Sequence, residues 1–336
     1  YGGNVRAAFE LRGTPTDRAI FADNAVQHED DSAAVQFPHH AGVNPDVMTG
    51  RGELFVYGNA HRVNTAKQLA VGNFDGDGCS DVFQAVGTVW VYSPCGSGIW
   101  RFLNASRLSL NRLGFGDFNG DGRTDVFTQE GDRWLVSYGG TGPLTPLPAG
   151  SRIPMTDYRF GDLDGDGRTD VFRANGSRFY YSSAGATQWK PLAASHLKIG
   201  QLRLCDFNGD GKIDVFSLAN HQWSVSYGGA TEWHRLNREL SSSLGDLVLA
   251  DFNGDGRCDV ARIHRNSLQV SWSGTTPWRS EPRRYQESVS GTLAGNFAGG
   301  TRAGLLEFAY GGEALMRFRL STDFGPLLSW SRQDMR

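Results

Sequence analysis

A stretch of twelve residues, Gly161 to Phe172 with the sequence GDLDGDGRTDVF, returns with small changes along most of the 336-residue chain. Five acidic copies begin their loops at residues 73, 117, 162, 206 and 251, which are 44, 45, 44 and 45 residues apart. A regular period of this length is the signature of a repeat architecture. The chain is therefore expected to form a series of similar units, each built from one copy.

Each copy places side-chain oxygen atoms at positions 1, 3, 5 and 9 of a loop. In one copy these are Asp162, Asp164, Asp166 and Asp170, and Gly167 at position 6 allows the positive φ of a sharp turn. Such a group of carboxylates needs a hard cation, and calcium takes six to eight oxygen ligands at about 2.3–2.6 Å. With the main-chain carbonyl of position 7 included, the predicted ligands of about five structural calcium ions are Asn73, Asp75, Asp77, Cys79, Asp81, Asp117, Asn119, Asp121, Arg123, Asp125, Asp162, Asp164, Asp166, Arg168, Asp170, Asp206, Asn208, Asp210, Lys212, Asp214, Asp251, Asn253, Asp255, Arg257 and Asp259.

An EF-hand is the main alternative for a loop of this kind, and flexible acidic turns without a metal are another. An EF-hand needs a bidentate Glu at position 12 and a helix on each side. Position 12 is Arg173 here, and the flanking residues 158–160 and 170–172 contain the aromatic and β-branched residues typical of strands. Each loop is therefore predicted to join two β-strands.

The residues between the loops predict the rest of each unit. Residues 214–218 read as a strand, residues 219–221 as a turn, and residues 223–233 as two strands around a Gly-Gly hairpin. Four antiparallel strands in about 45 residues are typical of a propeller blade. The predicted fold is an all-β, seven-bladed β-propeller of four-stranded antiparallel blades with calcium-binding loops between strands 1 and 2. The predicted blades cover residues 33–66, 67–110, 111–154, 155–199, 200–244, 245–289 and 290–336, after an N-terminal extension of residues 1–32 that forms a strand or an assembly arm.

The first and last of these blades are degenerate copies. Their ligand positions hold Pro38, His40, Gly42 and Asp46 in one case and Asn296, Ala298, Gly300 and Gly304 in the other. Neither set is expected to hold calcium. Terminal repeats are commonly atypical because they face a different neighbour.

The motif FGDFNGDGRTDVF at residues 115–127 and its copies resemble the FG-GAP or VCBS repeats, whose propeller is also that of integrin α subunits. The resemblance covers about residues 33–333. It implies a propeller in which such loops bind calcium between the first and second strands of a blade. The chain differs from integrins in its Val-Ser-Tyr-Gly-Gly segments and lacks a Gly-Ala-Pro element after the loop, so integrin-type partners are not expected. It looks more similar to bacterial secreted repeat proteins and propeller lectins.

The formal net charge of the chain is −3, and five calcium ions would raise the sum to −3 + 10 = +7. In a four-stranded blade the calcium loops lie at one end, so the variable turns lie at the other, where binding usually resides. The arginines and histidines of these turns predict an anionic partner, and the candidate ligand-binding residues are Arg133, Arg173, Arg178, His221, Arg262 and His264. Nucleic acid is not expected, because the chain has no concentrated basic run. The recurring Trp and Tyr residues are attributed mainly to packing between blades.

Three functions fit this pattern. The first is a secreted, calcium-stabilised binding module that recognises carbohydrate, as a lectin does, or another extracellular ligand without catalysis. The second is a carbohydrate-active enzyme, a polysaccharide lyase or hydrolase, in which His39 and His40, with Tyr57 and His61 nearby, act as acid and base groups. The third is a structural subunit that assembles through residues 1–32. No catalytic motif is visible in the sequence, which favours a protein that is not an enzyme.

The four cysteines allow two disulfides. Cys79 in the first calcium loop and Cys95 in the hairpin of the same blade are predicted to pair, and Cys205 and Cys258 could pair across two blades. Free thiols are the alternative. No apolar run is long enough to cross a bilayer. Disulfides and calcium sites together predict an extracellular or cell-surface location.

Overall fold

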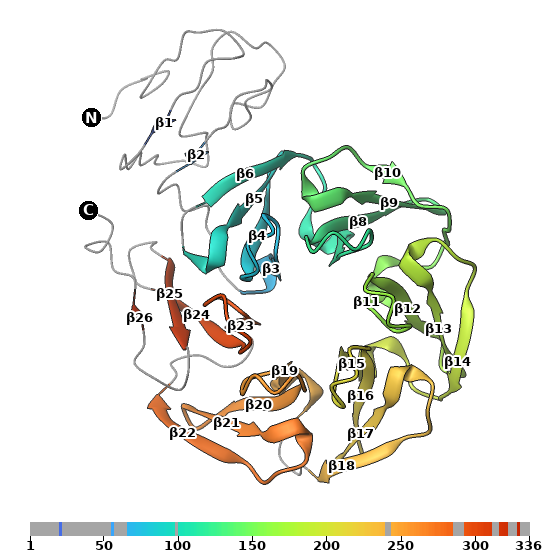
Figure 1. Ribbon diagram of the computed structural model, residues 1–336, viewed down its shortest axis with the longest axis vertical. Helices are drawn as coiled ribbons and strands as arrows, with labels where there is room; N and C mark the ends of the chain where they lie inside the picture. Colours follow the sequence, from blue (N-terminus) through green and yellow to red (C-terminus); the bar gives the residue numbers. More distant parts are fainter. Residues whose placement is uncertain are drawn as a thin grey trace, which may run out of the picture.

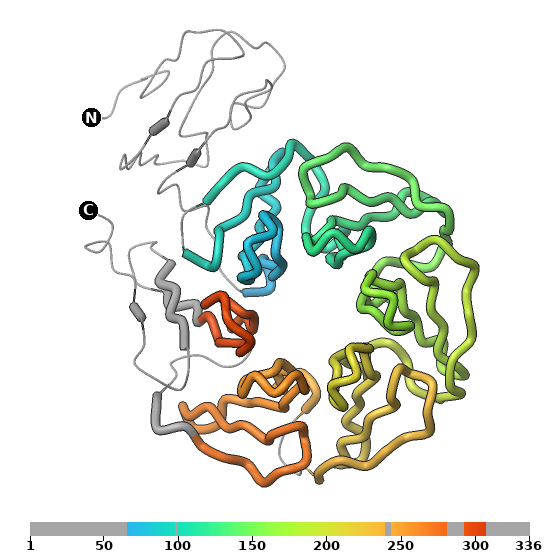
Figure 2. Tube along the Cα trace, in the orientation of Figure 1, coloured from blue at the N-terminus to red at the C-terminus, as the bar shows by residue number. Residues whose placement is uncertain are grey.

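The computed structural model describes residues 66–97, 100–238, 243–284, 292–310, 316–321 and 328–329, and two short strands at residues 20–21 and 55–56. Its described secondary structure consists of β-strands and three-residue 3-10 helices. The strands form six sheets arranged as a ring, which the chain follows once from β3 to β26 (Figures 1 and 2). No helix among the described residues is long and apolar enough to cross a membrane.

Five sheets have four antiparallel strands each, and the first sheet has six strands in the order β1-β2-β6-β5-β4-β3. The strands, sheet by sheet, are β1 (Ile20–Phe21), β2 (Phe55–Val56), β3 (Leu69–Gly72), β4 (Asp81–Val86), β5 (Val89–Ser93) and β6 (Trp100–Ala105); β7 (Leu113–Gly116), β8 (Asp125–Glu130), β9 (Arg133–Ser137) and β10 (Thr145–Pro146); β11 (Arg159–Gly161), β12 (Asp170–Ala174), β13 (Arg178–Ser182) and β14 (Lys190–Ala194); β15 (Leu202–Cys205), β16 (Asp214–Ala219), β17 (Gln222–Ser226) and β18 (His234–Arg238); β19 (Val248–Ala250), β20 (Asp259–His264), β21 (Ser267–Ser271) and β22 (Arg279–Arg284); β23 (Thr292–Gly295), β24 (Gly304–Tyr310), β25 (Met316–Ser321) and β26 (Leu328–Ser329).

The 3-10 helices occur at two recurrent places, before the inner strand of a sheet and in the hairpin between its third and fourth strands. They are η1 (Ala66–Gln68), η2 (Pro94–Gly96), η3 (Leu110–Arg112), η4 (Tyr138–Gly140), η5 (Met155–Asp157), η6 (Ser183–Gly185), η7 (Ile199–Gln201), η8 (Tyr227–Gly229), η9 (Leu244–Asp246) and η10 (Trp272–Gly274). In the first five sheets the inner and second strands are joined by the acidic loop, as predicted, and in the sixth they are joined by the degenerate copy that begins at Asn296. The second strand begins at position 9 of that loop.

The hydrophobic core lies between the sheets, because both faces of a blade pack against a neighbour. One cluster fills each of the six junctions around the ring. At the junction of the second and third sheets, Trp134 is buried against Tyr158 and Trp189, with ring centroids 5.6 and 5.4 Å away. Trp223 and Trp278 form a similar edge contact at 5.2 Å between the fourth and fifth sheets. The prediction that the recurring aromatic residues mainly pack between blades is confirmed for these residues.

The ring closes without a seventh blade. Inner strand β23 contacts inner strand β3, and the Ser80 N–H donates a hydrogen bond of 2.7 Å to the Asn296 carbonyl. A further sheet between them would separate these two groups. The predicted count of seven is therefore wrong: the described residues form five four-stranded blades and one six-stranded sheet. The only described strand from residues 33–66 is β2, which extends the first sheet by pairing with β6.

Candidate functional site

The last aspartate of each acidic loop is completely buried and ties two parts of its blade together. One carboxylate oxygen accepts the N–H of loop position 2, and the other accepts an N–H from the hairpin 14 residues further along the chain. In the second sheet, Asp125 accepts the N–H groups of Phe118 and Gly139, both at 2.7 Å. The five such residues, each 0% exposed, are Asp81, Asp125, Asp170, Asp214 and Asp259.

The hairpin is shaped to present this N–H group. Its donor residue has a left-handed backbone in all five sheets, with φ values of 47° at Cys95, 57° at Gly139, 49° at Ala184, 56° at Gly228 and 47° at Ser273. Glycine adopts this conformation without a steric penalty, which explains the recurrent Gly-Gly pair. The sequence reasoning missed this second role of position 9, although the constant spacing of 14 residues was available as a signal.

The first aspartate of a loop organises the loop's own backbone. Asp206 accepts the N–H of Gly209 with one carboxylate oxygen at 2.7 Å and that of Gly211 with the other at 2.9 Å. Position 5 then accepts the N–H of position 7, as Asp210 does from Lys212 at 2.9 Å. Asp117, Asp162 and Asp251 repeat the arrangement of Asp206. These four loops thus share one hydrogen-bonded backbone conformation.

The all-aspartate loop tests whether these residues suit a cation. Carboxylate oxygens of Asp162, Asp164 and Asp170 lie within 4.8 Å of one another. Asp164 Oδ1 is buried and has no hydrogen-bond partner. Arg168 pairs with the neighbouring Asp166 at 2.6 Å. A buried carboxylate oxygen without a partner is costly, so the donor set fits a hard cation.

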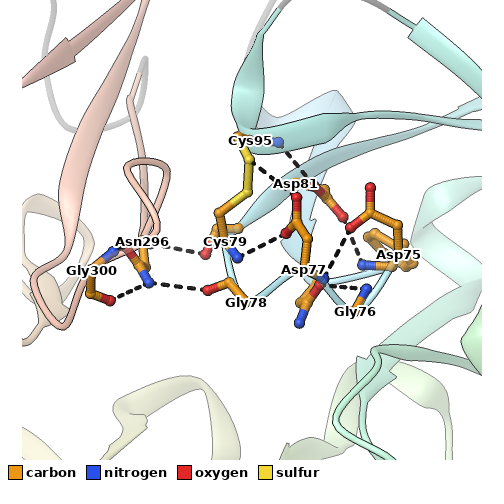
Figure 3. The surroundings of a disulfide bond; sticks show 12 residues. Asp75, Gly76, Asp77, Gly78, Cys79, Asp81, Cys95, Asn296 and Gly300 are labelled. Atoms are coloured by element: carbon orange, nitrogen blue, oxygen red, sulfur yellow. Dashed lines mark hydrogen bonds between the residues drawn. A yellow bond between two sulfur atoms is a disulfide. The ribbon is translucent and has the colours of Figure 1, made fainter.

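Neighbouring loops are linked into a ring. The N–H of position 8 in each loop donates to the position 1 carbonyl of the loop before it, at 2.5–2.7 Å around all six junctions. At the closing junction, Figure 3 shows Asn296 beside Gly78 and Cys79, with its side-chain Nδ2 donating to the Gly78 carbonyl at 3.2 Å. A cation that rigidified one loop would therefore also act on the contact between two sheets.

Comparison with known proteins assigns the repeat. A profile described as an FG-GAP-like repeat matches residues 117–173 and 206–262, which span the acidic loops of four consecutive sheets from the second to the fifth. The chain contains FG-GAP-like repeats. A comparison of the whole sequence with functionally characterised proteins gives no match.

Solved structures share the fold of these FG-GAP-like repeats at low sequence identity. An Agrocybe aegerita lectin, described as recognising non-reducing terminal N-acetylglucosamine, is 16% identical with a TM-score of 0.53, covering 78% of this chain and 79% of the lectin. The Photorhabdus luminescens Tc holotoxin pore is 16% identical with a TM-score of 0.52, covering 76% of this chain and 14% of the toxin chain. At this identity the similarity shows the fold alone.

Both predicted disulfides are present. Cys79 and Cys95, with Cα atoms 5.4 Å apart, connect position 7 of the first loop to the hairpin donor of the same sheet (Figure 3). Cys205 and Cys258, 6.0 Å apart, join the end of β15 to position 8 of the next FG-GAP-like loop. At two other junctions the positions equivalent to Cys205 and Cys258 hold glycine and threonine. These are Gly72 with Thr124 and Gly116 with Thr169, and in each case the threonine side chain lies close to the glycine.

We expect the double variant Cys79→Arg/Cys95→Gly to lower the free energy of unfolding by about 2 kcal/mol. The two new residues are those that the second sheet has at the equivalent positions, Arg123 and Gly139. Losing a disulfide that closes a short loop costs about 3 kcal/mol, and glycine at a left-handed position recovers about 1 kcal/mol. Urea unfolding under oxidising conditions measures the difference. Equal stability of the variant and the wild type would contradict a structural role for this disulfide.

The six predicted ligand-binding residues lie in the second and third strands, or the turns between them, of four different sheets. Two of the arginines are engaged within the fold: the Arg262 side chain, 8% exposed, lies 4.2 Å from the centre of the Trp278 ring, and Arg173 lies 5.3 Å from that of Trp189. Two others make surface contacts, Arg133 with Glu130 at 2.8 Å and Arg178 with the Leu192 carbonyl at 2.8 Å. His221 is exposed in a turn, and His264 ends β20. These assignments remain predictions.

The histidines of the enzyme alternative, His39, His40 and His61, lie outside the described residues together with Tyr57. The ligand positions of the first degenerate copy lie there too. In the last copy, Ala303 keeps the backbone link to the Asp251 carbonyl at 2.7 Å, although positions 3, 5 and 9 carry no carboxylate.

Proposed function

We propose that this protein is an extracellular, calcium-stabilised β-propeller that binds a glycan or another extracellular ligand. The observation that supports it most is the geometry of the acidic loops. The carboxylates of Asp162, Asp164 and Asp170 converge, Asp164 Oδ1 has no hydrogen-bond partner, and each acidic loop is hydrogen-bonded to the loop of a neighbouring sheet. Two disulfides are consistent with an extracellular location.

In each of the five loops, the side chains of positions 1, 3, 5 and 9 and the carbonyl of position 7 would hold one calcium ion. The ion would supply positive charge that stabilises several close carboxylates, including one that is completely buried. The position 9 carboxylate carries the backbone N–H bonds between loop and hairpin, so its ligation would strengthen the connection within a blade. Five bound ions would raise the formal charge to −3 + 10 = +7, which would favour an anionic partner.

The stabilisation by calcium is expected to grow as the pH rises from 5 to 7. Burial raises the pKa of Asp81, Asp125, Asp170, Asp214 and Asp259 from 3.8 to about 6, and nearby carboxylates add to the effect. Below pH 6 calcium must displace protons from these groups. Without calcium, the folded protein holds more protons than the unfolded chain between about pH 4 and 6, so these groups lower stability as the pH rises through that range.

Urea unfolding at pH 5, 6 and 7, with and without calcium at matched ionic strength, measures this dependence. The calcium-dependent increment in the free energy of unfolding should be largest at pH 7. An increment that does not change with pH would contradict ligation by the buried carboxylates.

A glycan array probed with the full chain in calcium tests the binding function. The array should include terminal N-acetylglucosamine, which the structurally similar lectin is described as recognising, and glycans that carry uronate or sulfate. We expect saturable binding without cleavage products. His221→Ala and Arg178→Ala should weaken it, whereas Arg123→Ala, on the exposed loop side, should not. No binding above background, or loss of binding only in Arg123→Ala, would contradict the proposal.

A further inference from the structure

The inner strands differ from one another at one position, three residues before the acidic loop begins. Four sheets have small or apolar residues there, namely Ala70, Gly114, Val248 and Leu293. Two consecutive sheets have arginine instead, Arg159 in β11 and Arg203 in β15. At this position of the inner strand, only these two of the six sheets carry a charged residue.

The two arginines lie on neighbouring strands at the inside of the ring, because β11 and β15 are in contact (Figure 1). Both side chains are half-buried. Arg159 Nη1 donates to the carbonyls of Tyr158 at 2.7 Å and Thr156 at 3.3 Å, and Arg203 Nη1 donates to that of Leu202 at 3.0 Å. All three carbonyls precede the arginines in the chain, so the guanidinium groups lie toward the ends of the strands that are remote from the acidic loops.

Neither guanidinium is in direct contact with a carboxylate within the described part of the chain. No ion pair joins either one to a described Asp or Glu, and their Nε and Nη2 groups have no hydrogen-bond partner there. Burial lowers the pKa of both arginines, and the positive charge of Arg203 lowers the pKa of Arg159 further, although the Asp157 carboxylate acts in the opposite direction on Arg159. Two half-buried cations that repel each other are unfavourable unless an anion lies between them.

We propose that Arg159 and Arg203 form a binding site for an oxyanion, at the inside of the ring and on the side opposite the acidic loops. The free Nε and Nη2 donors of a guanidinium match the spacing of two oxygens of a sulfate, phosphate or carboxylate group. The anion would be a free ion or a charged group of a larger ligand. The site depends neither on calcium nor on glycan recognition, so it can be tested separately from the proposed function.

Isothermal titration calorimetry of the full chain with sodium sulfate tests this site, with sodium chloride at matched ionic strength as the reference. Wild-type protein should bind sulfate saturably. Arg159→Leu and Arg203→Leu introduce an apolar residue, as other sheets have at the equivalent position with Val248 and Leu293. Each substitution should weaken sulfate binding about tenfold or more. Arg152→Leu, which removes an exposed arginine paired with Asp132, should leave sulfate binding unchanged. Parallel titrations with phosphate and acetate identify the preferred oxyanion.

Thermal unfolding distinguishes a binding role from a structural one. In buffer without oxyanions, the Arg159→Leu/Arg203→Leu variant should melt at the same temperature as the wild type or above it, because two unpaired charges are gone. In saturating sulfate the wild type should melt at a higher temperature than the double variant, because only the wild type binds the ion. If the leucine variants do not fold, Arg159→Lys and Arg203→Lys keep the charge and should weaken binding while preserving the fold. Two results would overturn the proposal. One is that sulfate, phosphate and acetate bind to the variants as tightly as to the wild type. The other is a variant whose melting temperature lies below that of the wild type by the same amount with and without sulfate.

Discussion

Calcium-depleted protein is expected to melt at least about 10 °C below the calcium-loaded protein. An ion that binds only the folded state contributes about 2.7 kcal/mol when its free concentration is a hundred times its dissociation constant. Five such sites would contribute about 13 kcal/mol together, and in a large domain each kcal/mol shifts the melting temperature by roughly 2 °C. Differential scanning calorimetry in excess calcium and in excess chelator measures the shift.

Magnesium at the same concentration is the control for this measurement. It demands near-ideal octahedral geometry and gives up its water reluctantly, so it should restore only a small part of the lost melting temperature. Identical melting curves in calcium, chelator and magnesium would contradict a structural role for calcium.

Replacing one buried carboxylate should have the second large effect. Asp214→Ala is expected to lower the free energy of unfolding of the calcium-depleted protein by about 4 kcal/mol. Asp214 is completely buried and accepts the N–H groups of Phe207 and Gly228, both at 2.8 Å. Removing the acceptor leaves two buried donors unpaired, at about 1–3 kcal/mol each, and adds a cavity.

Asp210→Ala in the same loop is the matched control, because Asp210 is exposed. Without calcium it should change stability by only about 0.5 kcal/mol, whereas in calcium both variants should lose affinity for the ion. Urea unfolding in chelator measures the first difference and calcium titration the second. If Asp214→Ala were as mild as Asp210→Ala in chelator, the buried carboxylate would not hold the blade together.

The loops and the blades could be predicted from the sequence because their signals are local and repeated. The spacing of Asp162, Asp164 and Asp170 marked a loop, and the β-branched and aromatic residues around it marked strands. The pairing of Cys205 with Cys258 could be anticipated because one ends an inner strand and the other lies in the next loop. In each case the information lies in short segments whose place within the repeat is known.

The number of sheets could not be read in the same way. Ring closure depends on how Asn296 meets Ser80, which are 216 residues apart, and a degenerate copy at residues 33–66 was counted as a blade on its pattern alone. The roles of Arg159 and Arg203 depend equally on the contact between two inner strands. An alignment of the copies would show that Arg159 and Arg203 differ from the other sheets at this position. That neither arginine forms an ion pair with a described carboxylate is visible only in the structure.

An anomalous difference map from crystals of the full chain grown in calcium tests most directly whether the acidic loops are metal sites. We expect five peaks, one enclosed by positions 1, 3, 5, 7 and 9 of each loop beginning at residues 73, 117, 162, 206 and 251, and none at the copy beginning at Asn296. The same ring of sheets with no peak at any of the five loops would contradict the central claim.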